Sequence, residues 1–255
     1  MKVAVILRQV PDVVEELVIA EDGRSLSEDD VMCVTNELDD HALEQALIMK
    51  GKQGARVTAI CVGGSETRDA LATSVAKGAD EAISVAIEFK DRGDNHKLAL
   101  HLADTLKTGG FDLILSGMQA VDEIDGSLGG ILATHLGRPY AGGLTGVEIA
   151  AGGGKVTVKK AYSGGRTGVM DIVIPAVLGI QSAEQPPRYV PVNKVMQTKK
   201  TLQVKEIKTP VPGVTGLHVS QLSKPETGAK AKMIEGDEEA VATSIAGLLK
   251  ERGLL

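Results

Sequence analysis

The residues best placed to do chemistry lie in the loop 116–130. Around Gly126 and Ser127, backbone N–H groups and a hydroxyl come together at the start of a helical pattern, where an anion is favoured. Asp122, Glu123 and Asp125 of the same loop would repel a polyphosphate without Mg²⁺, but they can accept hydrogen bonds from ribose hydroxyls. The loop alone leaves two interpretations open. It is either a site for one phosphate or a helix N-terminus whose acids favour the helix dipole.

Known phosphate-binding and catalytic motifs are missing from the sequence. The loop 116–130 has no lysine, and neither G-x-x-x-x-G-K-[ST] nor a G-x-G-x-x-G after the first strand is present. A second candidate loop, 36–41, also precedes a helix, and its Asn36 either caps that helix or contacts a ligand. We find no Ser-His-Asp order, no HExxH and no metal pattern around the two cysteines. The sequence therefore predicts no catalytic residue and no metal ligand.

An alternation of strands and helices must position these loops. Continuous apolar runs predict buried parallel strands, and the amphipathic stretches between them predict helices. The expected strands are 3–7, 57–62, 81–87 and 111–115; the expected helices run from Asp39 or Asp40 to Gly51, from a cap at Ser65 to Gly78, over 97–106 and near 126–136. Ligands of such sheets bind beyond the carboxyl ends of the strands, where the loops 8–12, 62–65 and 116–127 meet. We expect an α/β fold with a mostly parallel, doubly wound, Rossmann-like sheet whose loops suit a nucleotide.

The second half of the chain has a different composition and a different hydrophobic pattern. Glycine pairs separate the alternating segments 155–159 and 169–174, which predicts hairpin strands that extend the sheet up to residue 180. Beyond residue 183, prolines block regular helix, at Pro186, Pro187, Pro191, Pro210 and Pro212. Residues 188–208 hold six basic residues and one acid, and a last amphipathic helix is expected over 238–251. We expect a nucleotide-binding domain over 1–183 and an arm with a final helix over 184–255 that lies on another chain.

The bulk composition excludes some function classes. The chain has 255 residues, a net charge of −6 and only 2% aromatic residues, which argues against nucleic-acid binding. No signal peptide opens the sequence, and no apolar run reaches the ~20 residues that span a bilayer. We expect a cytoplasmic protein in a bacterium, or a mitochondrial matrix protein in a eukaryote.

Several motifs together resemble the β subunit of electron-transfer flavoproteins (the ETF β/FixA family), nearly from end to end. The matching segments are the start 1–12, the helix motif from Asn36 to Leu47, the turn 76–80, the loop 117–122, the glycine-bearing stretch 158–175, and Pro187-Arg188-Tyr189 with Val195-Met196 and Lys199-Lys200. The sequence departs from the family at Glu37-Leu38 and at 122–129. That loop matches neither the usual AMP-binding pattern nor the pattern of members that bind a second FAD and bifurcate electrons.

The resemblance implies a redox carrier subunit rather than a self-contained enzyme. It implies a heterodimer with an α subunit, an FAD held mainly by that subunit and faced by Leu38, and a structural AMP in the three-loop cleft. The implied nucleotide contacts are Ile6, Asn36, Glu37, Leu38, Asp39, Val62, Gly117, Met118, Gln119, Ala120, Val121, Asp122, Glu123, Ile124, Asp125, Gly126, Ser127 and Leu128.

The resemblance also implies a docking segment for acyl-CoA or other dehydrogenases, which we expect to be mobile. Its residues are Tyr189, Val190, Pro191, Val192, Asn193, Lys194, Val195 and Met196, with Val192 as the protruding apolar anchor. The carrier would pass its electrons to a quinone oxidoreductase or another acceptor. Two alternatives stay open: a bifurcating form with a second FAD in the β-subunit site, and a stand-alone adenine-nucleotide-binding module.

Overall fold

The first apolar run of the chain forms β1 (Lys2–Pro11), which lies inside the sheet. Its parallel neighbours are β3 (Arg56–Gly63) and β5 (Leu113–Gly117). Val5 faces one hydrophobic cluster and Ile6 faces the other, because successive strand residues point to opposite faces. A strand buried on both faces must be apolar throughout, which explains the continuous run in the sequence.

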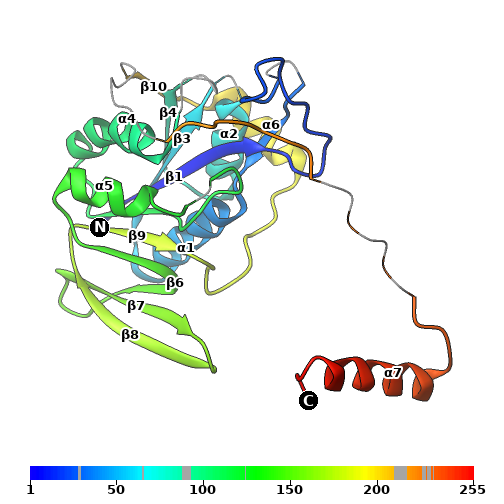
Figure 1. The fold of residues 1–255 in the computed structure, drawn as a ribbon. Helices are drawn as coiled ribbons and strands as arrows, with labels where there is room; N and C mark the ends of the chain where they lie inside the picture. Colours follow the sequence, from blue (N-terminus) through cyan, green and yellow to red (C-terminus); the bar gives the residue numbers. More distant parts are fainter. Residues whose placement is uncertain are drawn as a thin grey trace. The chain divides into compact units, whose positions relative to one another are not determined.

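The computed structural model describes residues 1–27, 30–64, 66–87, 93–123, 125–209, 217–225, 228, 231 and 233–255. Within these residues one sheet has the order β10-β4-β3-β1-β5-β9-β6-β7-β8, and β2 pairs antiparallel with the end of β1 (Figure 1). Its other strands are β2 (Cys33–Thr35), β4 (Glu81–Ala86), β6 (Tyr140–Ile149), β7 (Lys155–Tyr162), β8 (Arg166–Val173), β9 (Ala176–Ile180) and β10 (Lys205–Lys208). From β10 to β6 the strands run parallel, whereas β7 and β8 add an antiparallel extension.

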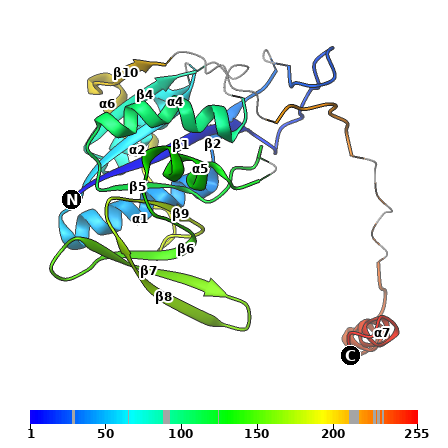
Figure 2. The same cartoon turned by 60° about the vertical axis from the view of Figure 1, so that its left-hand side comes forward.

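Helices cover both faces of the parallel part of the sheet (Figures 1 and 2). On one face lie α1 (Glu37–Gln53) and α2 (Thr67–Lys77), and on the other lie α4 (Asn95–Thr108) and α5 (Leu128–Leu136). Each face buries its own cluster of aliphatic side chains against the sheet. The expected α/β fold with a mostly parallel, doubly wound sheet and a β-rich extension is confirmed.

Two elements of the expected arm belong to the first compact unit of the fold instead. The helix α6 (Val192–Thr201) contacts α2, and β10 pairs in parallel with β4. Pro191 is the N-cap of α6, where its missing N–H costs nothing, so this proline begins a helix rather than preventing one. Pro210 and Pro212 lie outside the described residues. Met1–Leu222 is one compact unit, so the structure moves the expected boundary at residue 183 to residue 222.

The second unit, Ser223–Leu255, contains the expected last helix, α7 (Glu238–Glu251). Asp237 caps it, since its side chain accepts a hydrogen bond of 2.9 Å from the backbone N–H of Ala240. None of the residues of α7 is buried. Ser65, the expected cap of α2, is outside the described residues.

Candidate functional site

Arg8 stands where three loops meet at the carboxyl edge of the sheet. It lies near the end of β1, with a side chain that is only 1% exposed. Its guanidinium donates to Asp39 of α1, to Glu123 of the β5–α5 loop and, through Nη2 at 2.9 Å, to the carbonyl oxygen of Gly117. One arginine therefore holds the end of β1, the start of α1 and the loop after β5 together.

Asp39 is the main partner of Arg8. It accepts hydrogen bonds from the backbone N–H and from Nε of Arg8, both at 2.9 Å, and from Nη2 at 2.8 Å. Its Oδ1 also accepts from the backbone N–H of Gly117 at 2.6 Å. Burial alone would lower the pKa of Arg8, but Asp39 and Glu123 outweigh burial and raise it. Arg8 therefore stays charged inside the fold.

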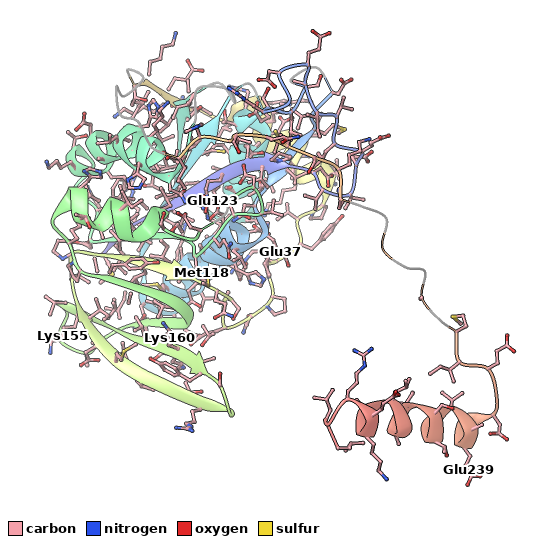
Figure 3. All side chains as sticks on the ribbon, in the orientation of Figure 1. Glu37, Met118, Glu123, Lys155, Lys160 and Glu239 are labelled. Carbon is pink, nitrogen blue, oxygen red and sulfur yellow. The ribbon has the colours of Figure 1, made fainter. Side chains whose placement is uncertain are left out.

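Two further contacts fix the β5–α5 loop. Glu123 accepts from Nη1 of Arg8 at 2.5 Å and from the backbone N–H of Ala120 at 3.2 Å. Asn36 donates from Nδ2 to the carbonyl oxygen of Gln119 at 3.0 Å. The side chain of Asn36 makes no capping hydrogen bond to α1, although the residue occupies the N-cap position. The capping role expected for Asn36 is therefore wrong, because its amide fastens one candidate loop to the other, whereas its contact with a ligand stays a prediction (Figure 3 labels Glu37, Met118 and Glu123 in these segments).

The backbone of α1 and the end of β5 touch at Gly117. A Cβ at this position would lie 2.6 Å from the carbonyl carbon of Leu38 and 2.7 Å from the backbone nitrogen of Asp39. No side chain fits there without moving the helix, because real Cβ contacts do not fall below about 3 Å. The glycine of the 117–122 motif therefore permits a close helix–strand approach.

An anion position lies at the N-terminus of α5. Three donors converge on Oδ1 of Asp125: the Ser127 hydroxyl at 2.8 Å, the Ser127 backbone N–H at 3.2 Å and Nδ2 of Asn95 at 2.7 Å. The hydrogen bonds of Ser127 and Asn95 lower the pKa of Asp125, so its carboxylate is charged at neutral pH. The chain's own carboxylate oxygen thus occupies the place suited to an anionic oxygen.

A scan against family models matches residues 25–212 of this chain to the electron transfer flavoprotein domain. The chain belongs to this family. It is similar to curated proteins named electron transfer flavoprotein subunit beta. The Methylophilus methylotrophus protein is 28% identical over 99% of this chain and 95% of the relative, and that of Syntrophomonas wolfei is 30% identical over 98% and 96%. The Clostridium acetobutylicum protein is 28% identical over 98% of each chain.

The nucleotide contacts that the resemblance implies lie in different surroundings in the structure. The side chains of Ile6 and Val62 are buried in the core beneath α4 and α5, so only their backbone can reach a ligand. Asn36, Asp39, Gly117 and Glu123 take part in the loop contacts described above. Other carried-over residues reach the surface at the same edge: Glu37, Gln119, Val121, Asp122 and Asp125 are exposed, and Leu38, Met118, Gly126 and Ser127 are half-buried. Ala120 and Leu128 are buried, and Ile124 is outside the described residues.

The donor set at the α5 N-terminus fits one phosphate group once the carboxylate of Asp125 has left it. The Ser127 hydroxyl, the Ser127 N–H and the Asn95 amide suit a single anionic oxygen, and an internal carboxylate already takes that place. Because Asp125 is exposed, rotation of its side chain into solvent is enough to release the donors. A phosphate must therefore compete with Asp125. The sequence analysis identified Ser127 but not Asn95, which lies 30 residues before Asp125 in the chain.

Arg8 was also not identified from the sequence as a site residue. The sequence does hold a signal for it, because Arg8 is a cation at the end of the first strand and the loops 36–41 and 116–130 at the same edge carry acids. Among the described residues, no group of His, Cys, Asp or Glu side chains is arranged to hold a metal ion. Within the same residues, no helix combines the length and the apolar character needed to cross a bilayer.

The expected docking segment is partly helical. Tyr189 and Pro191 precede α6, and Val192 to Met196 form its first turns. Tyr189 is 82% exposed, Val192 71% and Met196 53%. Val192 and Met196 are four residues apart, so they lie on one side of the helix. Residues 192–196 of this segment therefore belong to a helix of the domain with an apolar exposed side.

Proposed function

We propose that this chain is the β subunit of a heterodimeric electron transfer flavoprotein. It pairs with an α subunit, shares an FAD with it, accepts electrons from acyl-CoA or other dehydrogenases and passes them to a quinone oxidoreductase or another acceptor. The observation that supports this most is the similarity to curated β subunits over 98–99% of the chain.

The flavin, when bound, supplies the electron-accepting chemistry, and the protein supplies position and electrostatics. Leu38 is half-buried in the first turn of α1 and offers an apolar contact for that group. Asp39, one residue on, is fixed by Arg8, so the position of Leu38 depends on the buried ion pair. The proposed role of this chain is to hold the flavin rather than to transform a substrate.

We further propose that the three-loop cleft holds AMP as a structural ligand. Ser127 and Asn95 would hold the phosphate once Asp125 turns away, and the loop acids near Gln119 would accept hydrogen bonds from ribose hydroxyls. One phosphate needs only such a small donor set, whereas phosphoryl transfer needs the lysine that the loop lacks.

Co-expression with an electron transfer flavoprotein α subunit of the same organism tests the proposal. A yellow complex should co-purify, and denaturation should release one FAD and one AMP per heterodimer. Release of two FAD molecules without AMP would favour the bifurcating form. A stable monomer that retains ATP and ignores the α subunit would overturn the heterodimer.

A further inference from the structure

A polar side of α1 accepts the backbone of residues 183–188. The N–H of Ala183 donates to Nδ1 of His41 at 3.3 Å, and the N–H of Glu184 donates to Oε1 of Gln45 at 3.1 Å. The N–H of Arg188 donates to Oε2 of Glu44 at 3.0 Å. Glu44 and Gln45 follow His41 by three and four residues, so the three acceptors lie on one side of the helix.

The last of these contacts is also an ion pair. Arg188 donates from Nε to Oε2 of Glu44 at 2.8 Å and from Nη2 to Oε1 at 2.7 Å, which is the two-pronged geometry of a strong arginine–carboxylate pair. The Glu44 side chain is 4% exposed and the Arg188 side chain 42%. Burial alone would raise the pKa of Glu44, but Arg188 outweighs it, so the pKa lies below its ordinary value. The pair is therefore charged and geometrically fixed.

Arg188 immediately precedes the exposed apolar group Tyr189, Val192 and Met196. At its far end α6 is held separately, since Lys199 pairs with Asp69 of α2 and Leu202 packs against the core. Near the N-terminus of α6, the strongest polar contact among the described residues is the Arg188–Glu44 pair. Loss of that contact would free the three apolar side chains more than the rest of α6.

The same helix also contributes to the proposed nucleotide site. Asp39 in its first turn holds Arg8, and Glu44 follows five residues later, or about 7.5 Å along the axis. A helix over this distance is rigid. This short helical segment therefore fixes the position of the proposed docking residues relative to the proposed nucleotide site.

We propose that Glu44, acting through Arg188, is a positioning residue that sets Tyr189, Val192 and Met196 for docking of the electron donor. This inference rests on the proposed function, because it assigns to these three side chains a dehydrogenase as partner. It adds a residue that lies inside the domain and touches neither partner nor cofactor.

The test uses the Glu44→Gln variant in the complete heterodimer with bound FAD. The glutamine has the size of the glutamate but cannot form the charged pair. The donor is an acyl-CoA dehydrogenase of the same organism with its acyl-CoA. We expect the KM for the carrier to rise about tenfold, with kcat within about twofold and the FAD content unchanged. Amide hydrogen exchange should accelerate in residues 188–196 and stay unchanged in α1.

Glu81→Gln is the matched control, because Glu81 forms an exposed pair with Arg56 away from this segment. It should leave the KM and the exchange of residues 188–196 unchanged. If Glu44→Gln does not yield a folded complex, Arg188→Gln removes the same pair from its more exposed side. An unchanged KM together with unchanged exchange overturns the inference.

Failure of the proposed function looks different. If the wild-type complex is not reduced by the dehydrogenase, the assignment of the donor fails, whereas hydrogen exchange still decides whether Glu44 orders residues 188–196. Faster exchange with an unchanged KM would show that the ion pair orders the segment but that docking does not depend on it, and this also overturns the inference.

Discussion

The backbone N–H, Nε and Nη2 of Arg8 all donate to the carboxylate of Asp39, so a single ion pair joins the end of β1 to the start of α1. Both side chains are almost fully buried, at 1% and 0% exposure. A buried pair of this kind gives modest net stability, but the loss of one partner leaves an uncompensated charge inside the fold. The two residues are therefore best understood as a unit.

Replacement of Asp39 by Asn tests this unit. The substitution leaves Arg8 with one carboxylate less in a buried place, and we expect a loss of about 3–5 kcal/mol in the free energy of unfolding. Urea titration followed by circular dichroism measures the change. Glu37→Gln is the control, because Glu37 is an exposed acid in the same first turn, and it should change stability by less than about 1 kcal/mol. Equal effects of the two variants would contradict the prediction.

Removal of the Asp125 carboxylate should strengthen AMP binding. Asp125→Ala frees the Ser127 and Asn95 donors, and we expect about a tenfold lower Kd for AMP with the Kd for adenosine within about twofold. Calorimetric titration of the α–β complex, after its nucleotide has been removed, measures both. Asp122→Ala removes a nearby charge without freeing these donors. If both variants strengthen binding equally, the effect comes from the charge of the loop and not from competition at one position.

The close approach at Gly117 predicts opposite effects of two glycine substitutions. Gly117→Ala should destabilise the protein by about 2 kcal/mol or more, because its Cβ would meet the backbone of α1. Gly51→Ala should stabilise it by about 0.5–1 kcal/mol, since a Cβ there meets no atom within 4 Å and alanine favours a helix. Thermal unfolding of the two variants gives the signs. A tolerated Gly117→Ala would mean that the helix shifts easily.

A charge on the exposed side of α6 should slow electron delivery. Val192→Asp places a carboxylate in the apolar group next to Tyr189 and Met196, and we expect at least a fivefold slower reduction by the dehydrogenase with unaltered bound FAD. Stopped-flow absorbance of the flavin measures the rate. Gln197→Asp puts the same charge five residues further along α6, on a different side of the helix, and it should have a small effect. Equal rates for Val192→Asp and the wild type would remove Val192 from the docking surface.

The Glu44–Arg188 pair predicts a pH dependence of stability. Arg188 holds the pKa of Glu44 below its ordinary value of 4.5, so the unfolded chain takes up the proton first as the pH falls. The stability from this group is complete above the unfolded pKa and is lost as the pH falls through the folded pKa. We expect wild type and Glu44→Gln to differ by about 1–2 kcal/mol at pH 7 and by less than about 0.5 kcal/mol at pH 3. Urea titrations at both pH values decide, and a constant difference would contradict the prediction.

The parallel sheet could be predicted because strands that are buried on both faces must be apolar at every position. Runs such as 3–7 and 57–62 are apolar at every position, and short loops between alternating elements leave few topologies. The three loops of the site followed from this topology. The apolar periodicity likewise predicts the start of α5 at Leu128 and the end of α7 at Glu251 to within two residues.

The elements α6 and β10 could not be predicted, because their stability comes from distant partners. The sequence 192–201 has basic residues and a preceding proline. Its contact with α2, and the Arg188–Glu44 pair just before it, join positions more than 100 residues apart. The role of Arg8 was hidden in the same way. A lone arginine at a strand end is ordinarily a surface residue, and only the convergence of Asp39 and Glu123 makes it buried.

The strand β10 has a consequence for the way in which a partner meets α6. The chain returns to the sheet beside β4 soon after α6. The segment that contains α6 is therefore held at both ends, by Glu44 of α1 before the helix and by the β10–β4 pairing after it. A surface that is already ordered loses little conformational entropy on association. In the proposed docking, Tyr189, Val192 and Met196 therefore offer a contact whose shape exists before any partner arrives, and selectivity among partners would depend on fit rather than on adaptation.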